Sequence, residues 1–184
     1  GDVTNERMVK HMDRHHYIYL ASFFPDIIKV GTVVAERKYV RLIEQDALYS
    51  YIVAEAPGHM IQELEAKIAK HLNLTRSVQT RTKSSGLFNK INTQKAKRFL
   101  SQHIDSLRKT PDLNKYLLSD SELVDFTEHL GIYYHPGQTF SVDSPASLVG
   151  KFLGLRGKQI ILETDHGTVI HKTSRLTNRY FSHP

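Results

Sequence analysis

The chain of 184 residues contains no cysteine and no tryptophan. Without cysteine it forms no disulfide, no thiolate zinc site, no cysteine-ligated iron–sulfur cluster and no cysteine nucleophile. No apolar segment approaches the roughly 18 residues that a membrane-spanning helix needs, so we do not expect an integral membrane protein. The first seven residues carry no apolar stretch and predict no secretory signal, which together with the missing cysteines favours a cytoplasmic location.

Several catalytic signatures are absent as well. The sequence has no Walker loop and no Gly-x-Gly-x-x-Gly, so it gives no support for a nucleotide cofactor. It also lacks the Gly-x-Ser-x-Gly elbow of serine hydrolases. With 40% hydrophobic and 24% charged residues, the composition is that of a globular protein long enough to bury a core.

The net charge of +6 is distributed unevenly along the chain. Residues 1–65 carry −3, residues 66–109 carry +10, residues 112–143 carry −5 and residues 144–184 carry +4. A concentrated basic segment is typical of a protein that binds a phosphate backbone, and equally of a solvated face. The candidate nucleic-acid contacts are Arg76, Arg81, Lys83, Lys95, Lys97 and Arg98, with a second basic surface at Arg156, Lys158, Lys172, Arg175, Arg179 and Tyr180.

Hydrophobic periodicity in the first part of the chain predicts a β-β-α-β-α unit at residues 1–75. A hairpin is indicated by two β-rich runs on either side of Pro25-Asp26, a pair of turn-forming residues. The expected elements are strands at 17–21 and 27–33, a short helix at 35–45, a strand at 51–55 and a helix at 59–72.

The rest of the chain predicts a basic loop and helical segment at 76–143 and a small antiparallel β-meander at 144–184, so the fold class is α+β. Glycines at 154 and 157 and the segment 165–167 are expected to separate the strands of the meander. The expected elements are a loop at 73–89, helices at 93–109 and 119–130, and strands at 148–152, 159–163 and 168–171.

Short motifs on the hairpin and on two helices point to a known superfamily. Tyr17-Ile18-Tyr19 and Lys29-Val30-Gly31 on paired strands, Arg41 on the next helix and Glu65 on a later one resemble the GIY-YIG nucleases. The resemblance covers about residues 15–73 and implies a divalent-metal-dependent endonuclease that binds DNA or RNA. The implied catalytic residues are Tyr17, Tyr19, Lys29, Arg41 and Gln45, and the implied Mg²⁺ ligand is Glu65.

Phosphodiester hydrolysis needs an activated water and positive charge near the reacting phosphate. Tyr17 or Tyr19 could orient or deprotonate the water, Arg41 could stabilise the transition state, and Glu65 could hold the Mg²⁺ ion. Each residue also has a simpler interpretation. The tyrosines would pack as aromatic core residues, Arg41 would form a surface ion pair with Glu44, and Glu65 would lie on a solvated helix face.

Three positions differ from the superfamily pattern. Tyr17 stands where the family has its first glycine, Lys29 where it has its second tyrosine, and Gln45 where many members have histidine. Lysine at the second of these positions also occurs in phage-type branches. Tyr17 and Gln45 at these positions favour an alternative function, that of a catalytically inactive module that binds a protein partner. Because Lys29 alternates with Ile28 and Val30, it is either a cation facing a groove or an exposed strand lysine.

A second resemblance covers more of the chain. It rests on Tyr19-Leu20-Ala21, Lys29-Val30-Gly31-Thr32, the segments 41–47 and 54–57, and the distal segment 154–161. These residues look like a prokaryotic family known only as a domain of unknown function. Its members usually carry cysteines before the first strand, and this chain has none. The resemblance implies an architecture and no particular reaction.

Overall fold

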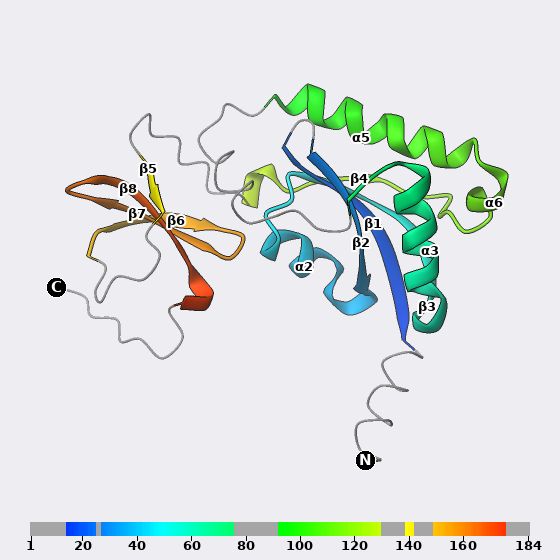
Figure 1. The fold of residues 1–184 in the computed structure, drawn as a ribbon, viewed down its shortest axis with the longest axis horizontal. Helices are drawn as coiled ribbons and strands as arrows, with labels where there is room; N and C mark the ends of the chain where they lie inside the picture. Colours follow the sequence, from blue (N-terminus) through cyan, green and yellow to red (C-terminus); the bar gives the residue numbers. More distant parts are fainter. Residues whose placement is uncertain (1–13, 25–26, 76–91, 130–138, 142–148, 176–184) are drawn as a thin grey trace, which may run out of the picture.

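The computed structural model of the chain has two four-stranded β-sheets, and the longer helices pack on the first sheet (Figure 1). The predicted α+β fold class is confirmed. No helix in the described part of the chain is long and apolar enough to cross a bilayer. The structure describes residues 14–24, 27–75, 92–129, 139–141 and 149–175.

The first sheet has the strand order β2-β1-β3-β4, and all neighbouring strands are antiparallel. The predicted hairpin, short helix, third strand and second helix are all present, with bounds shifted by a few residues. The elements are β1 (His15–Phe24), β2 (Ile27–Val34), the 3-10 turn η1 (Ala35–Arg37), α2 (Lys38–Glu44), β3 (Tyr49–Pro57), α3 (Gly58–His71), α5 (Thr93–Arg108), α6 (Pro111–Asn114), β4 (Leu123–Asp125) and the 3-10 turn η2 (Thr127–His129).

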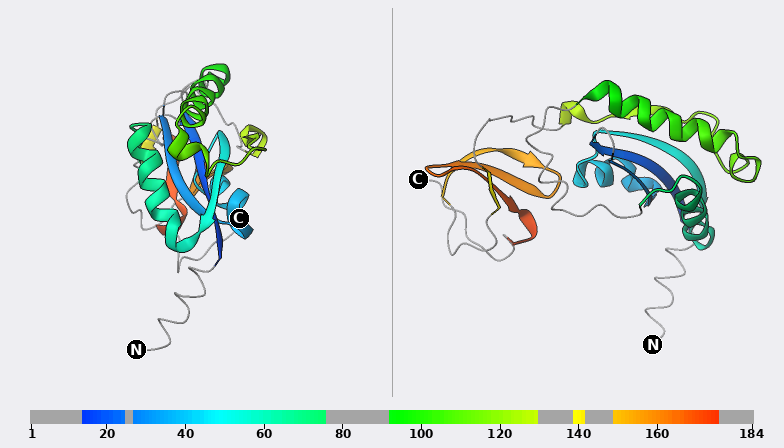
Figure 2. Two further views of the ribbon diagram at one scale, coloured as in Figure 1. Left: turned by 90° about the vertical axis from the view of Figure 1, so that its right-hand side faces the viewer. Right: turned by 45° about the horizontal axis from the view of Figure 1, so that its top comes forward.

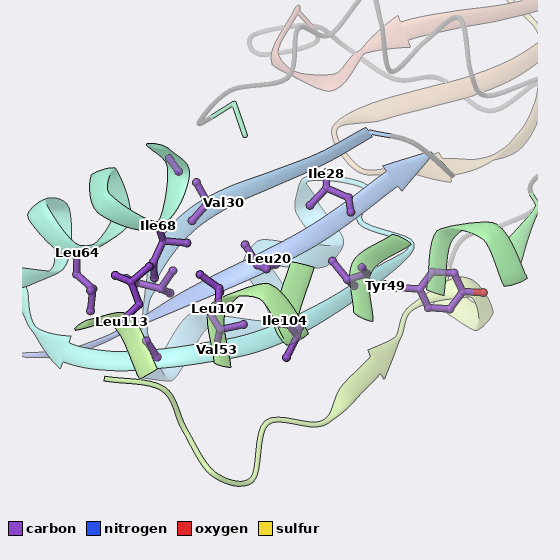
Figure 3. Close-up of a cluster of buried hydrophobic side chains, with 14 of the residues drawn as sticks. Leu20, Ile28, Val30, Tyr49, Val53, Leu64, Ile68, Ile104, Leu107 and Leu113 are labelled. Atoms are coloured by element: carbon purple, nitrogen blue, oxygen red, sulfur yellow. The ribbon is translucent and has the colours of Figure 1, made fainter. Parts of the chain in front are cut away.

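The two faces of this sheet bury different sets of side chains. Helices α3 and α5 cover one face, where Ile68, Ile104 and Leu107 pack on the strands (Figure 3). Burying each such side chain contributes about 1.5–3 kcal/mol, which makes this face the main core. The other face is covered by α2, which inserts Leu42 against Tyr19. Figure 2 shows α5 and α2 on opposite sides of the sheet.

The predicted helix at 119–130 is wrong. Residues 123–125 instead form β4, which pairs with the edge of β3, and a 3-10 turn follows. The backbone N–H of Phe126 donates to the Leu48 carbonyl at 2.9 Å, and the Phe126 side chain is buried under the sheet. An isolated 12-residue helix is only marginally stable, so pairing with the open edge of β3 decides the local structure.

The second sheet has the strand order β5-β8-β7-β6. Strands β6, β7 and β8 form the predicted antiparallel meander, and β5 adds to it in parallel with β8. Gly154 does not separate two strands, because it lies within β6 at a register shift. Gly157 lies in the turn after β6 and Gly167 begins β8, and both have positive φ. The elements are β5 (Thr139–Ser141), β6 (Lys151–Arg156), β7 (Gln159–Thr164), β8 (Gly167–Lys172) and the 3-10 turn η3 (Thr173–Arg175).

Candidate functional site

The hairpin of β1 and β2 brings Tyr19 and Lys29 to the face of the sheet that α2 covers. Ile28 and Val30 point into the core beneath α3 and α5, so Lys29 between them points the other way. Its Nζ atom lies 5.6 Å from the centroid of the Tyr19 ring and 5.7 Å from that of Phe23. Both are cation–π distances. Lys29 is half-buried, so the interpretation of Lys29 as an exposed strand lysine does not hold, whereas the interpretation as a cation that faces a groove stays a prediction.

Helix α2 supplies the next two residues of the site. Arg41 and Gln45 are four residues apart and therefore lie on one side of the last helical turn. The Tyr19 hydroxyl donates a hydrogen bond to Gln45 Oε1 at 3.1 Å, which ties the helix to the centre of the sheet. Arg41 keeps 43% of its side chain exposed, and its Nη1 lies 3.8 Å from Glu44 Oε2. Glu44 makes its closer contact, at 2.9 Å, with Arg37.

Helix α3 contributes Glu65, which is only 7% exposed. The interpretation of Glu65 as a residue on a solvated helix face is therefore wrong. Glu63, two positions earlier, shows what a solvated glutamate on this helix looks like: its side chain is 72% exposed and pairs with Lys67 at 2.7 Å. The difference follows from helical geometry, because positions two apart point in nearly opposite directions.

The charges of Arg41 and Glu65 act on the pKa of both Tyr19 and Lys29, so the four side chains lie in one neighbourhood. Burial raises the pKa of Tyr19 to about 12, against a smaller opposing effect of the hydrogen bond to Gln45. Burial, aided by Arg41, lowers the pKa of Lys29 to about 8, and Glu65 opposes that shift. At neutral pH the phenol is protonated, and part of the lysine population is a neutral amine.

Tyr17 lies on the same face of β1 as Tyr19 and packs at the border of the same apolar cluster. Lys38 Nζ lies 5.3 Å from the centroid of its ring. Tyr17 is thus placed beside the start of α2, whereas Tyr19 and Gln45 are joined at its end. For Tyr17 the structure agrees with the aromatic-packing interpretation.

The candidate nucleic-acid contacts fall into two groups. Lys95 and Arg98 are exposed on α5, while Lys97 pairs with Asp125 at 3.3 Å and lies 4.8 Å from the centroid of the Tyr49 ring. Lys97 therefore has a structural role, because it joins α5 to β4 and β3. The other three candidates, Arg76, Arg81 and Lys83, lie outside the described residues.

The second basic surface needs one correction. Arg156 is not a surface cation, because it is buried in an ion pair with Asp46 at 2.8 Å. It cannot reach solvent, and its charge is directed into the protein. Lys158 and Lys172 are exposed, as the basic-surface hypothesis requires. The Arg175 side chain and residues Arg179 and Tyr180 lie outside the described part of the chain.

Sequence reasoning gave Asp46 no role, although it lies within the segment 41–47 that carries the second resemblance. This residue follows the last turn of α2 with a positive φ of 68°, a conformation that non-glycine residues rarely adopt. Aspartate is among the residues enriched there, and that preference is the one local signal for it. Its ion-pair partner is 110 residues away in sequence, so no spacing rule would have found the pair.

The chain matches one known family, described as "Protein of unknown function (DUF2797)", over residues 4–175. The match includes both sheets and every residue of the candidate site. No curated protein and no solved structure matches the chain. Because the match spans most of the sequence, the chain belongs to the DUF2797 family of proteins of unknown function.

Proposed function

We propose that this protein binds nucleic acid and hydrolyses phosphodiester bonds at the site formed by Tyr19, Lys29, Arg41, Gln45 and Glu65. One observation carries the proposal: four separate elements bring these five side chains into a single neighbourhood. They come from β1, β2, the end of α2 and α3. A group of titratable residues with shifted pKa values is the kind of feature that active sites share. The order of these elements is also the one that the GIY-YIG resemblance implies.

The pKa shifts suggest which residue accepts the proton from the attacking water. A general base works best when its pKa lies near the operating pH. Lys29, with a pKa lowered to about 8, meets that condition, whereas Tyr19, with a pKa raised to about 12, does not. We therefore assign proton acceptance to Lys29. Tyr19 positions Gln45 through its hydrogen bond and takes no proton.

Arg41 supplies the positive charge that phosphodiester hydrolysis needs. Its side chain is 43% exposed and its contact with Glu44 is as long as 3.8 Å, so a phosphate group can approach it. A guanidinium donates two parallel hydrogen bonds to phosphate oxygens, and this geometry stabilises the negative charge that develops in the transition state.

Glu65 is the residue that would hold a Mg²⁺ ion. The residues present fit such an ion, because Mg²⁺ prefers oxygen ligands and keeps several waters, so one protein carboxylate is sufficient. Within the described residues there is no cluster of three or more His, Cys, Asp or Glu side chains, so Glu65 would act with water and substrate oxygens. When bound, the metal would polarise the phosphoryl oxygens.

The proposal is tested by nucleic-acid binding and cleavage at low ionic strength. Fluorescence anisotropy with single- and double-stranded DNA and RNA should reveal binding that weakens as salt rises. Cleavage in Mg²⁺ or Mn²⁺ should fall at least 100-fold in Glu65→Gln and Arg41→Ala. The matched controls are Glu63→Gln on α3 and Arg37→Ala beside α2, and both should cleave as wild type does. Salt-insensitive or undetectable binding would refute the proposal, and cleavage unaffected by Glu65→Gln would refute its enzymatic part.

A second candidate function is a catalytically inactive module that binds a protein partner. The observation in its favour is a run of exposed apolar side chains along β6, the edge strand of the second sheet: Val149 just before the strand, then Phe152 and Leu155. Exposed apolar residues on a sheet edge are typical of a protein contact. If this candidate is correct, Phe152→Ser should abolish binding of the protein partner and leave nucleic-acid binding unchanged.

A further inference from the structure

The second sheet touches the first unit through a buried ion pair at the end of α2. Arg156 Nε donates to Asp46 Oδ1 at 2.8 Å, and the two side chains are only 4% and 5% exposed. Among the described residues, Arg156 Nη2 has no hydrogen-bond partner. The bond to Asp46 is therefore important for the guanidinium, because removing one member of a buried pair leaves the other charge uncompensated.

The backbones of the two units also meet at this point. Gly157, at the turn between β6 and β7, has a φ of +57°, and a Cβ there would lie 3.0 Å from the Glu44 carbonyl oxygen and from Asp46 Cβ. A side chain at position 157 would crowd the end of α2 and would be strained by the positive φ. Figures 1 and 2 both show the hairpin of β6 and β7 reaching toward α2. The contact thus combines an ion pair with close backbone packing.

This contact adjoins the candidate site in sequence and in space. Asp46 directly follows Gln45, the residue that accepts the Tyr19 hydrogen bond. The Gln45 backbone N–H in turn bonds to the Arg41 carbonyl, so both residues belong to the helical turn that Asp46 ends. Helix α2 has seven residues, too few for stability on its own, so tertiary contacts determine where its last turn lies.

We propose that Arg156 is a positioning residue for the candidate site. Its buried ion pair with Asp46 holds the last turn of α2, so that Gln45 meets the Tyr19 hydroxyl and Arg41 stays at the edge of the site. The catalytic consequence rests on the proposed function, whereas the effect on α2 does not. The C-terminal sheet is then a structural part of the site, because it supplies the ion-pair partner of Asp46.

Hydrogen exchange of the full chain, followed by mass spectrometry, tests the effect on α2. In Arg156→Gln, the amides of residues 41–48 should exchange at least tenfold faster than in wild type, while those of α3 keep their rates. Lys151→Gln, an exposed cation on the same strand β6, is the matched control and should exchange as wild type does. Wild-type rates at 41–48 in Arg156→Gln would overturn the proposal.

If Arg156→Gln unfolds, a double variant decides the question. Asp46→Asn with Arg156→Gln removes both buried charges and leaves two amides that can hydrogen-bond, so this protein should fold. A neutral hydrogen bond is weaker than a charge-assisted one. The backbone amides of residues 41–48 in the double variant should therefore exchange at least threefold faster than in wild type. Wild-type exchange in the double variant would overturn the positioning role.

Cleavage kinetics separate this inference from the proposed function. In a wild-type protein that cleaves nucleic acid, Arg156→Gln should lower kcat at least tenfold and change KM less than twofold. A raised KM with unchanged kcat would instead make Arg156 a determinant of substrate binding and overturn the proposal. If the wild type does not cleave, the proposed function fails, and hydrogen exchange still decides whether Arg156 holds α2.

Discussion

Gly31 on β2 lies directly opposite Tyr19 on β1, and the Tyr19 ring occupies the space that a side chain at Gly31 would need. An ideal Cβ at position 31 would lie 2.5 Å from Tyr19 Cζ and would also collide with the hydroxyl oxygen. Real Cβ atoms do not approach other atoms so closely. Glycine is therefore required here for space, and it allows the tyrosine to lie flat across the strand toward Gln45.

The first prediction is that Gly31→Ala destabilises the fold by about 1–3 kcal/mol, the usual cost of an overpacked core. Urea unfolding measures the effect. Adding Tyr19→Phe should not restore stability, because Cζ remains in the way, whereas adding Tyr19→Leu should restore part of it. A loss below about 0.5 kcal/mol in Gly31→Ala would contradict this account of the tyrosine's position.

The second prediction concerns the stability of the fold between pH 8 and pH 10.5. Burial lowers the pKa of Lys29 to about 8, so over this range the unfolded chain holds its proton on Lys29 more often than the folded chain does. Stability therefore rises with pH, and the gain is lost as pH falls through 8. We expect a gain of about 1–2 kcal/mol, because solvent screening reduces the full value.

The variant Lys29→Met tests whether Lys29 causes this pH dependence, because it removes the titrating amine. It should be more stable than wild type at pH 7. The difference in the free energy of unfolding between Lys29→Met and wild type should shrink as pH rises to 10. Above pH 10 the opposite trend sets in, because Tyr19 keeps its proton up to about pH 12 while an unfolded tyrosine has lost it. That loss of stability should be absent in Tyr19→Phe. A constant difference between Lys29→Met and wild type would contradict the prediction for Lys29.

Local sequence signals predicted the elements whose structure depends on their own residues. The hairpin had turn residues between two β-rich runs, and α3 and α5 had apolar residues at helical spacing, so each pattern matched the observed burial. The helix predicted at residues 119–130 was wrong for the opposite reason. The pairing of Leu123 to Asp125 with β3 is a contact that local periodicity does not contain.

The candidate site could be predicted in part. The motif positions of Tyr19, Lys29 and Arg41 indicated residues that the structure does bring together, and the alternation around Lys29 indicated the side to which it points. The burial of Glu65 was missed although its own segment contains the signal, because Glu65 lies four residues after Ile61 and three before Ile68, on the buried side of α3. The pairing of Asp46 with Arg156 was out of reach of local patterns, since it joins the end of α2 to the second sheet.

The third prediction is an energetic coupling between Tyr19 and Gln45. A double-mutant cycle with Tyr19→Phe and Gln45→Ala should give an interaction energy of about 0.5–1.5 kcal/mol by urea unfolding, the usual net value of one hydrogen bond. Tyr19→Phe with Arg37→Ala is the control cycle and should show no coupling, because Arg37 is not a partner of Tyr19 in the structure. A coupling near zero for Tyr19 and Gln45 would mean that the hydroxyl does not hold the end of α2.

The fourth prediction separates structural from nucleic-acid-binding lysines on α5. Lys97 bridges Asp125 at 3.3 Å and the Tyr49 ring at 4.8 Å, so Lys97→Ala removes a contact between α5 and the sheet. The expected loss is about 0.5–1 kcal/mol, because the ion pair is partly exposed and the cation–π contact is modest. Arg98→Ala, on the exposed side of the same helix, should leave stability unchanged.

Nucleic-acid affinity should depend on Arg98 and much less on Lys97. If α5 lies against a phosphate backbone, Arg98→Ala lowers affinity and reduces the salt dependence of binding by about one counterion, whereas Lys97→Ala changes neither by much. The measurements are urea unfolding and fluorescence anisotropy over a salt series, on the same protein preparations. Because Lys97 has its charge committed to Asp125, a loss of affinity in Lys97→Ala as large as that in Arg98→Ala would show that the ion pair opens when nucleic acid binds.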